Sequence, residues 1–396
     1  MPSDSPFYLT KIECPICKTV NEFETVKVGS YIENGRDTDF CPKEILWRFP
    51  KYEGWNPLVF FTATCSNCFY TREFNNSFKE WKSDNTFRTY RLKQIKEQHL
   101  DQLAQADSVV KQLGQMINIQ RHPNESAILK LLLCAFDEQL FETHSKLDLG
   151  RYYLRIAWLF RKHDSGDTNS MRQLKSVLLD VESKLRQMRH SIDNSRSAGD
   201  EFTRHLEAHF DTKEVPVELE SRMLPYRDKF VGAIKEIEAA FSHVEKKMDI
   251  MNELMSEYKS QVVGLTGPGG ASFGQFASFS DFLISLKEKW DGIVVDENEA
   301  IRAAIHNYKE SFVTGRDISP GNQEIQASYL IAELSRRVGD FDSAREYFNT
   351  TIKNGQEFIY QNRTDRSRTA LARKILELAV EQGRANLAQS KEYARG

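Results

Sequence analysis

The chain has 396 residues, of which 40% are hydrophobic and 28% are charged, and its formal net charge is -3. This length accommodates two or three domains with a sizeable core. The near-neutral charge gives no general attraction to nucleic acid or acidic membranes. The longest dense apolar stretch, residues 128–136, is far shorter than the ~20 residues of a membrane span, and the N-terminus has no apolar signal region. We therefore expect a cytoplasmic protein that does not contact membranes.

Residues 1–82 are expected to form a small β-rich module. Short segments rich in β-branched and aromatic residues alternate here with glycine and proline, a pattern typical of strands and loops. The expected strands are residues 7–12, 20–32 and 58–64. Because a module with so many loops buries little apolar surface, we expect a structural metal to supply part of its folding free energy.

Four of the six cysteines form two Cys-x-x-Cys pairs, Cys14 with Cys17 and Cys65 with Cys68. Two such pairs complete a tetrahedral shell of four thiolates, which suits Zn²⁺. In a reducing cytoplasm they are more readily ligands than disulfides; iron, disulfides and free thiols are the alternatives. We predict one structural Zn²⁺ per chain, held by these four residues. Because a full shell leaves no open position for a substrate, we do not expect an enzyme, and a metal-dependent enzyme is the less favoured alternative.

The other candidate ligands have plainer interpretations. Cys41 is expected to be a buried free thiol, with a fifth thiol near the metal as the alternative, and Cys134 lies in an apolar helix where it joins the core. His205 and His209 are four residues apart on one helical face, which can bind a metal, but an exposed helical pair is favoured. No residue set has the pattern of a catalytic nucleophile or a phosphate-binding loop.

Nucleic-acid binding by the N-terminal module is a weaker alternative. Residues 1–90 contain 11 Lys and Arg against 12 Asp and Glu, whereas phosphate contacts need clustered cations. Trp47, Tyr52 and Trp55 could stack on bases, but we favour a role in covering the small core. A basic run near the C-terminus is expected to be a solvated helix face; it comprises Arg363, Arg366, Arg368, Arg373 and Lys374.

From residue 83 onward the pattern becomes helical. Glycine and proline are sparse, and apolar residues recur with helical spacing. The expected helices are residues 83–99, 101–118, 124–143 and 149–163. Asn124 is the expected N-cap of the third helix. Residues 83–167 are therefore predicted to be the first part of a helical, repeat-like domain.

Residues 168–263 are predicted to form an antiparallel coiled-coil arm. Apolar residues with spacings of three and four indicate one heptad seam at Met171, Leu174, Leu178, Val181, Leu185, Met188 and Ile192, continuing to Leu206. A second seam comprises Phe230, Ile234, Ile237, Phe241, Val244, Met248, Met251, Met255, Tyr258 and Val262. Pro216 and Pro225 separate the two helices. Ser195 and Gly199 should weaken or bend the arm, and two helices packed flat on the main body are the alternative.

Residues 264–280 are rich in glycine, serine and phenylalanine and are expected to be a linker. Residues 281–396 are the predicted second part of the helical domain. Within it, Gln323–Lys353 resembles a tetratricopeptide repeat, with Gly339 in the turn and Ala344 and Phe348 on the second helix. Tyr153–Asp167 resembles the first helix and turn of another such repeat.

Taken together, these segments resemble a bacterial family of unknown function, in which a two-knuckle zinc ribbon precedes tetratricopeptide-like helices. The motifs that carry the resemblance are Cys14-Pro15-Ile16-Cys17, Asp39-Phe40-Cys41, Asn56-Pro57-Leu58, Cys65-Ser66-Asn67-Cys68-Phe69-Tyr70, Tyr153–Leu159 and Tyr329–Phe348. They cover roughly residues 8–165 and 322–385. The family usually has glycine directly after each knuckle, where this chain has Lys18 and Phe69.

The resemblance implies a mainly α fold with a small N-terminal β-rich zinc ribbon, and a zinc-binding scaffold with no established reaction. We expect a non-enzymatic scaffold or adaptor that binds a protein partner through its helical surface, its coiled-coil arm or both. Self-association through the arm is a further expectation, because its methionine-bearing seam can repack with a second copy.

Overall fold

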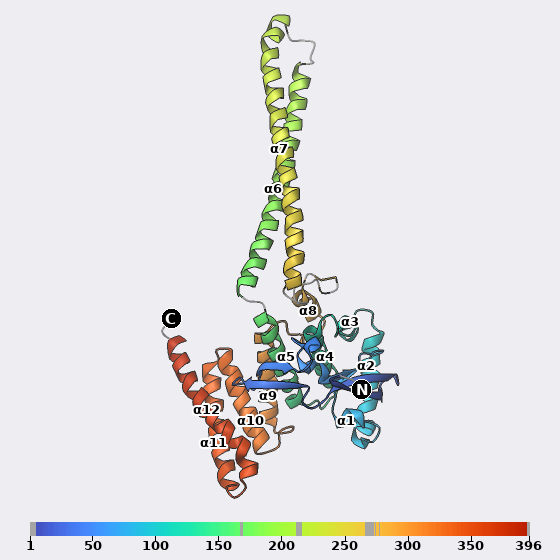
Figure 1. Cartoon of the computed structure of the whole chain (residues 1–396), viewed down its shortest axis with the longest axis vertical. Helices are drawn as coiled ribbons and strands as arrows, with labels where there is room; N and C mark the ends of the chain where they lie inside the picture. The colour runs from blue at the N-terminus through green and yellow to red at the C-terminus, as the bar shows by residue number, and fades with distance from the viewer. Residues whose placement is uncertain are drawn as a thin grey trace. The chain divides into compact units, whose positions relative to one another are not determined.

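The computed structural model describes residues 5–166, 169–210, 216–265 and 278–393, together with Phe273, Gln275 and Phe276, and the chain is mainly helical (Figure 1). Two compact units are present. The first comprises Met1–Asp164 and Ala271–Gly396, and the second comprises Ser165–Gly270. Within the described residues, no helix combines the length and the apolar character needed to cross a bilayer.

Among the described residues of the first unit, six strands form three antiparallel hairpins: β1 (Phe7–Glu13) with β2 (Val20–Val26), β3 (Tyr31–Arg36) with β4 (Pro42–Trp47), and β5 (Thr62–Thr64) with β6 (Thr71–Glu73). The predicted strand 20–32 is two strands, because Gly29 adopts a left-handed φ of 78° in a turn between them. The start of the predicted strand 58–64 is instead a 3₁₀ helix, Pro57–Phe60, since Pro57 favours a first helical turn.

The helices of the first unit include four in its first segment, α1 (Asn76–Lys79), α2 (Leu92–Ala104), α3 (Val109–Met116) and α4 (Pro123–Gln139), and then α5 (Lys146–Gly166), α8 (Phe279–Lys287), α9 (Glu297–Thr314), α10 (Asn322–Arg337), α11 (Phe341–Gln361) and α12 (Arg366–Tyr393). Several predicted boundaries were wrong. Helix α2 runs through residue 100, where a break was predicted, and α3 begins only at Val109. A π-helical segment, Phe87–Arg91, precedes α2. Asn124 lies inside α4 after Pro123, and its side chain instead binds the backbone of Gly54 and Asn56.

The main core surrounds α4, which is buried on almost every side. Helices α3, α5, α8, α9 and α10 contribute to this core, and so do Phe7, Val59 and Phe60 of the β-rich module. Trp47, Tyr52 and Trp55 pack around Phe7 and Phe60, with the Phe7 and Tyr52 ring centroids 5.1 Å apart. The aromatic residues therefore cover the core, as favoured from the sequence, and the β-rich module shares its core with the helices.

Helices α10 and α11 form a helical hairpin with a tight turn, as predicted. Gly339 has a φ of 82° in the turn, and the Asp340 carboxylate accepts a hydrogen bond from the Ser343 amide at the start of α11. Ala344 and Phe348 are buried against α10 and α12. The assignment of this pair as a tetratricopeptide repeat stays a prediction.

The second unit contains two long helices, α6 (Asn169–Phe210) and α7 (Val217–Leu265). They run antiparallel, since Arg189 pairs with Asp249 and Arg196 binds both carboxylate oxygens of Glu245. Leu185, Ile192 and Met248 are buried between them. Helix α7 continues through Pro225, so that residue does not separate the helices. The side chains of Met171, Leu174, Leu178, Leu206, His209, Tyr258 and Val262 lie outside the described residues.

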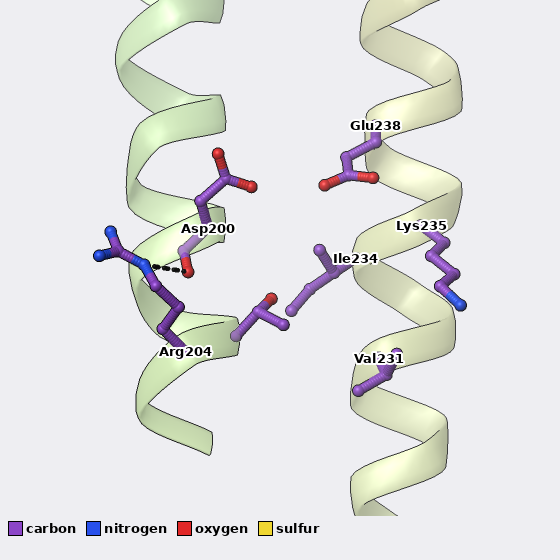
Figure 2. A pocket seen from close by; sticks show the side chains of 7 residues that line it. Asp200, Arg204, Val231, Ile234, Lys235 and Glu238 are labelled. Atoms are coloured by element: carbon purple, nitrogen blue, oxygen red, sulfur yellow. Dashed lines mark hydrogen bonds between the residues drawn. The ribbon is translucent and has the colours of Figure 1, made fainter. Parts of the chain in front are cut away.

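The predicted seam only partly coincides with the contact between these two helices. Met188, Phe202, Phe230, Ile237 and Met251 are each more than two-fifths exposed. Beyond Gly199 the helices leave a cavity of about 440 Å³, lined by residues that include Asp200, Arg204, Val231 and Ile234 (Figure 2). Neither Ser195 nor Gly199 lines this cavity, so the weakness expected at these two residues stays a prediction.

A buried charge network fastens the β3–β4 hairpin to the helices. The Asp39 carboxylate, which is 0% exposed, accepts hydrogen bonds from the Arg161 guanidinium of α5 at 2.7 and 3.2 Å and from the Trp158 indole. Arg161 also binds Glu297 of α9 at 2.7 Å. Burial alone would lower the pKa of Arg161, but its hydrogen bonds to Asp39 raise it overall. On α10, Arg337 pairs with Asp37 at 2.9 Å.

Replacing Arg161 should therefore destabilise the first unit. We expect Arg161→Ala to lower the free energy of unfolding by about 3 kcal/mol, because Asp39 would remain buried without its main cation. Urea denaturation followed by circular dichroism measures the loss. Arg151→Ala is the control, since Arg151 lies on the same helix in an exposed pair with Asp148 and should cost less than about 1 kcal/mol. Equal losses in the two variants would contradict this account.

Candidate metal centre

The two Cys-x-x-Cys segments form the tips of two β-hairpins with the same geometry. Glu13 pairs with Val20 at the end of one hairpin, and Thr64 pairs with Thr71 at the end of the other, so each tip contains six residues. In each tip the first cysteine amide donates to a carbonyl five residues on, at 2.8 Å for Cys14 and 2.9 Å for Cys65. Each is therefore a tight knuckle that turns two thiols toward one centre.

Each knuckle has a left-handed residue directly after its second cysteine, where the resemblance implies glycine. The φ of Lys18 is 65° and that of Phe69 is 62°. For residues other than glycine, this conformation costs about 1–2 kcal/mol. Lys18 compensates by lying over the Trp81 ring, 4.4 Å from its centroid. Phe69 packs so closely on Gly114 of α3 that a Cβ there would lie 2.1 Å from its ring. Both side chains thus make contacts that offset the cost of the left-handed conformation, which glycine would adopt without strain.

The four sulfurs form one compact cluster. The Sγ atoms of Cys14, Cys17, Cys65 and Cys68 all lie within 4.8 Å of one another. Sγ of Cys14 is 3.7 Å from Sγ of Cys68, and Sγ of Cys17 is 3.5 Å from Sγ of Cys65. In a tetrahedral site with metal–sulfur bonds of about 2.3 Å, the sulfurs are about 3.8 Å apart. The residues present therefore fit a tetrahedral metal ion.

The thiols of this cluster are close enough to share protons. The pKa of Cys14 is raised to about 12, chiefly by its hydrogen bond with Cys65, and the pKa of Cys68 is raised chiefly by Cys14. The pKa of Cys65 is lowered, because its sulfur accepts hydrogen bonds from these neighbours. A bound divalent cation would stabilise all four thiolates and release their protons.

Asn21 of β2 connects the first hairpin to the second knuckle. Its side-chain nitrogen donates to Sγ of Cys65 at 3.4 Å, and its oxygen accepts from the amide and hydroxyl of Ser66 at 2.9 and 2.8 Å. The residue is 7% exposed. Hydrogen bonds of this kind orient metal ligands and stabilise their charge. Sequence reasoning missed Asn21, which lies outside both cysteine motifs.

A buried His–Asp pair supports the second knuckle from the helical side. His99 of α2 is 0% exposed, and its Nε2 lies 2.8 Å from the Cys68 carbonyl oxygen. Its Nδ1 lies 2.7 Å from Oδ1 of Asp137 on α4, while Oδ2 of Asp137 accepts from the Thr71 amide at 2.8 Å. Burial lowers the pKa of His99, but the Asp137 charge outweighs it, so the pKa is raised overall. No sequence motif indicated this pair.

The other cysteines lie apart from the four-sulfur cluster. Cys41 follows the β3–β4 turn, is buried, and directs its thiol toward the Pro42 carbonyl oxygen at 3.6 Å. Burial raises its pKa to about 11, so the thiol stays protonated at neutral pH. Cys134 is buried in α4 and belongs to the main core. Both therefore match the plainer interpretation. His205 is exposed and pairs with Glu201.

Removing the charge of Asp137 should loosen the metal centre. Asp137→Asn would place an amide group against the Thr71 amide and end the attraction to His99, so we expect metal affinity to fall about 10–100-fold. Competition with a chromophoric chelator measures this affinity. Asp101→Asn is the matched control, because Asp101 is exposed on α2. If the two variants retained the metal equally well, the His99–Asp137 pair would have no role in holding it.

Comparison with known proteins identifies the family of the chain. The family model described as an uncharacterized protein conserved in bacteria (DUF2225) matches residues 7–197 and 285–372, more than half of the chain. No curated protein and no solved structure gives a match. The matched residues include all four clustered cysteines, and they extend into α6, beyond the residues that carried the resemblance in the sequence. The chain belongs to this bacterial family.

Proposed function

We propose that the protein is a non-enzymatic scaffold or adaptor, whose β-rich module is stabilised by one Zn²⁺ and whose helices bind a protein partner. The observation that carries this proposal is the four-sulfur cluster, in which every position of a tetrahedral shell has a protein ligand. Such a shell suits a structural role. Zn²⁺ is the ion of choice because it combines four thiolate ligands with tetrahedral geometry.

The surroundings of the cluster also favour a structural role. Cys14, Cys65 and Cys68 are buried together with Ile12, Ile16 and other side chains of a second hydrophobic cluster. This cluster extends to Ile95 of α2 and to Phe141 after α4. A metal held there would tie the two hairpins to the helices, because 47 residues separate Cys17 from Cys65. The ion would stabilise the surface that the helices present to a partner.

The C-terminal helices provide a surface for such a partner. Leu371, Val380 and Leu387 of α12 are at least one-third exposed, as is Tyr360 at the end of α11. Stacked helix pairs commonly bind peptides or partner helices along exposed faces of this kind. Positive charge from Arg363, Arg366, Arg368, Arg373 and Lys374 lies along the same segment and would favour an acidic partner.

Nucleic-acid binding by the β-rich module is the less favoured alternative. The cations near the first knuckle are already engaged, since Lys82 and Lys18 lie 2.9 and 3.8 Å from carboxylate oxygens of Glu13 and both flank the Trp81 ring. Phosphate contacts would have to displace these pairs. Salt-dependent retention of the protein on DNA or RNA at low ionic strength would favour this alternative over the scaffold.

Metal analysis tests the structural role. We expect about one Zn²⁺ per chain in protein purified under reducing conditions, measured by elemental analysis. Cys14→Ser or Cys65→Ser should lose the metal and unfold the β-rich module, while most of the helical circular dichroism remains. Cys41→Ser is the control, because Cys41 is buried outside the cluster and its hydroxyl could still donate to Pro42. Metal-free purified protein, or equal metal loss in Cys41→Ser, would refute the proposal.

Affinity capture tests the scaffold role. The full chain should retain a specific protein from a lysate of the source cell, and a chain lacking residues 168–263 should show whether the second unit is needed. Charge reversal on α12, as in Arg373→Glu with Lys374→Glu, should weaken an acidic partner bound to the first unit. If no protein is retained in any of these conditions, while the metal-loaded protein turns over a substrate, the non-enzymatic scaffold is wrong.

A further inference from the structure

Helix α7 has two apolar faces, and α6 covers only one of them. The inner face includes Ile234, Phe241, Met248 and Met255, which are partly or fully buried toward α6. The outer face begins at Leu219 and takes alternately the fourth and the third residue after it, as far as Leu254. This spacing over 36 residues, about 50 Å of helix, is the heptad pattern of a helix that packs on another helix.

The outer face is apolar along almost its whole length, and its large side chains are exposed except for Val244, which is half-buried against the cluster of Leu185, Ile192 and Met248. Ten of its eleven positions are apolar, and the exception is Lys247. The exposed fractions of its large side chains range from 42% for Met223 to 65% for Tyr226. The others are Leu219, Phe230, Ile237, Met251 and Leu254. A continuous apolar stripe of this size indicates an interaction surface, since scattered exposed apolar residues would show no heptad spacing.

Helix α6 extends this surface without covering it. Phe202 is 47% exposed, and its ring centroid lies 6.2 Å from that of Phe230. Met188 is exposed on the same heptad column of α6, fourteen residues earlier. The helices are also open beside Phe230, where Val231 and Ile234 line the cavity between them (Figure 2). The apolar stripe of α7 is therefore available to a further helix.

We propose that the outer face of α7 pairs, in antiparallel orientation, with the same face of a second copy of this chain. When Ala233 lies opposite Ile237 of the copy, the heptad spacing places Phe230 opposite Ala240 and Leu219 opposite Met251. Large side chains thus meet small ones at the centre of the pair, which is the complementarity that a two-fold symmetric contact requires. The same register places Tyr226 opposite Val244.

The single charged position also fits this register. Lys247 lies opposite Met223, near the ends of the contact, where its long side chain can extend its ammonium group to water. Two hairpins joined in this way would form a four-helix arrangement with the α7 helices in contact.

The inference rests on the proposed function, because it takes the helices as interaction elements. Its test is separate from that of the proposed function. If the chain proves to be a monomer, its metal content and its binding to a different protein would not change.

Mass measurement of the full, metal-loaded chain tests the proposal. Sedimentation equilibrium should show a dimer at micromolar concentration. Phe230→Glu with Ile237→Glu should weaken dimerisation about 100-fold or more, because two large apolar contacts at the centre would become charges. Ala239→Glu is the control, since Ala239 is exposed on the side of the same helix that faces away from the stripe, and it should leave the dimer unchanged. Circular dichroism should show equal helix content in all three proteins.

A compensating pair of substitutions tests the register. Ala240→Phe alone should weaken the dimer, because it places two phenylalanines opposite each other. Phe230→Ala added to Ala240→Phe should restore dimerisation, since a large side chain again meets a small one in the copy. A monomer at every concentration would overturn the proposal. So would a dimer that is weakened equally by the stripe and control variants, or one that the compensating pair fails to restore.

Discussion

The short β5–β6 hairpin is held from two sides, and the position of the second knuckle depends on this double attachment. On one side, its two thiols meet those of the β1–β2 hairpin within 4.8 Å. On the other, its backbone binds the buried pair of His99 and Asp137. A hairpin with three-residue strands has too few ladder hydrogen bonds to be stable alone. Sulfur chemistry and helix packing therefore stabilise the same few residues.

The features that could be predicted from the sequence are those that depend on the spacing of nearby residues. Two Cys-x-x-Cys pairs identify the four sulfurs, and the helical period identifies the segments that become α5, α6, α10 and α12. Strand β4 was missed because Pro42–Trp47 pairs with β3 and has little strand signal of its own. Asn21, His99 and Asp137 were missed for a different reason. Each is an ordinary polar residue in its local sequence, and its role arises only from contacts with residues 31 to 66 positions away.

In the long helices, the heptad spacing predicted the apolar residues correctly but did not determine which face of α7 turns toward α6. Heptad spacing predicted the apolar residues of α7, but a sequence with two apolar faces satisfies the pattern in more than one rotation of the helix. Ile234 and Met248 face α6, whereas Phe230, Ile237 and Met251, expected in the same seam, are exposed. The spacing identifies the apolar positions of α7, and contact with α6 selects which of them become buried.

The contact between Phe69 and Gly114 links two positions that are 45 residues apart in the chain. The phenylalanine fills the space above α3 only because position 114 has no side chain. A relative with glycine after its second knuckle would lose that ring and gain room for a side chain on α3. The two positions should therefore vary as a pair through evolution, with the large group carried by one or the other. Sequence covariation would then record how this hairpin is attached to α3, without any measurement on the metal.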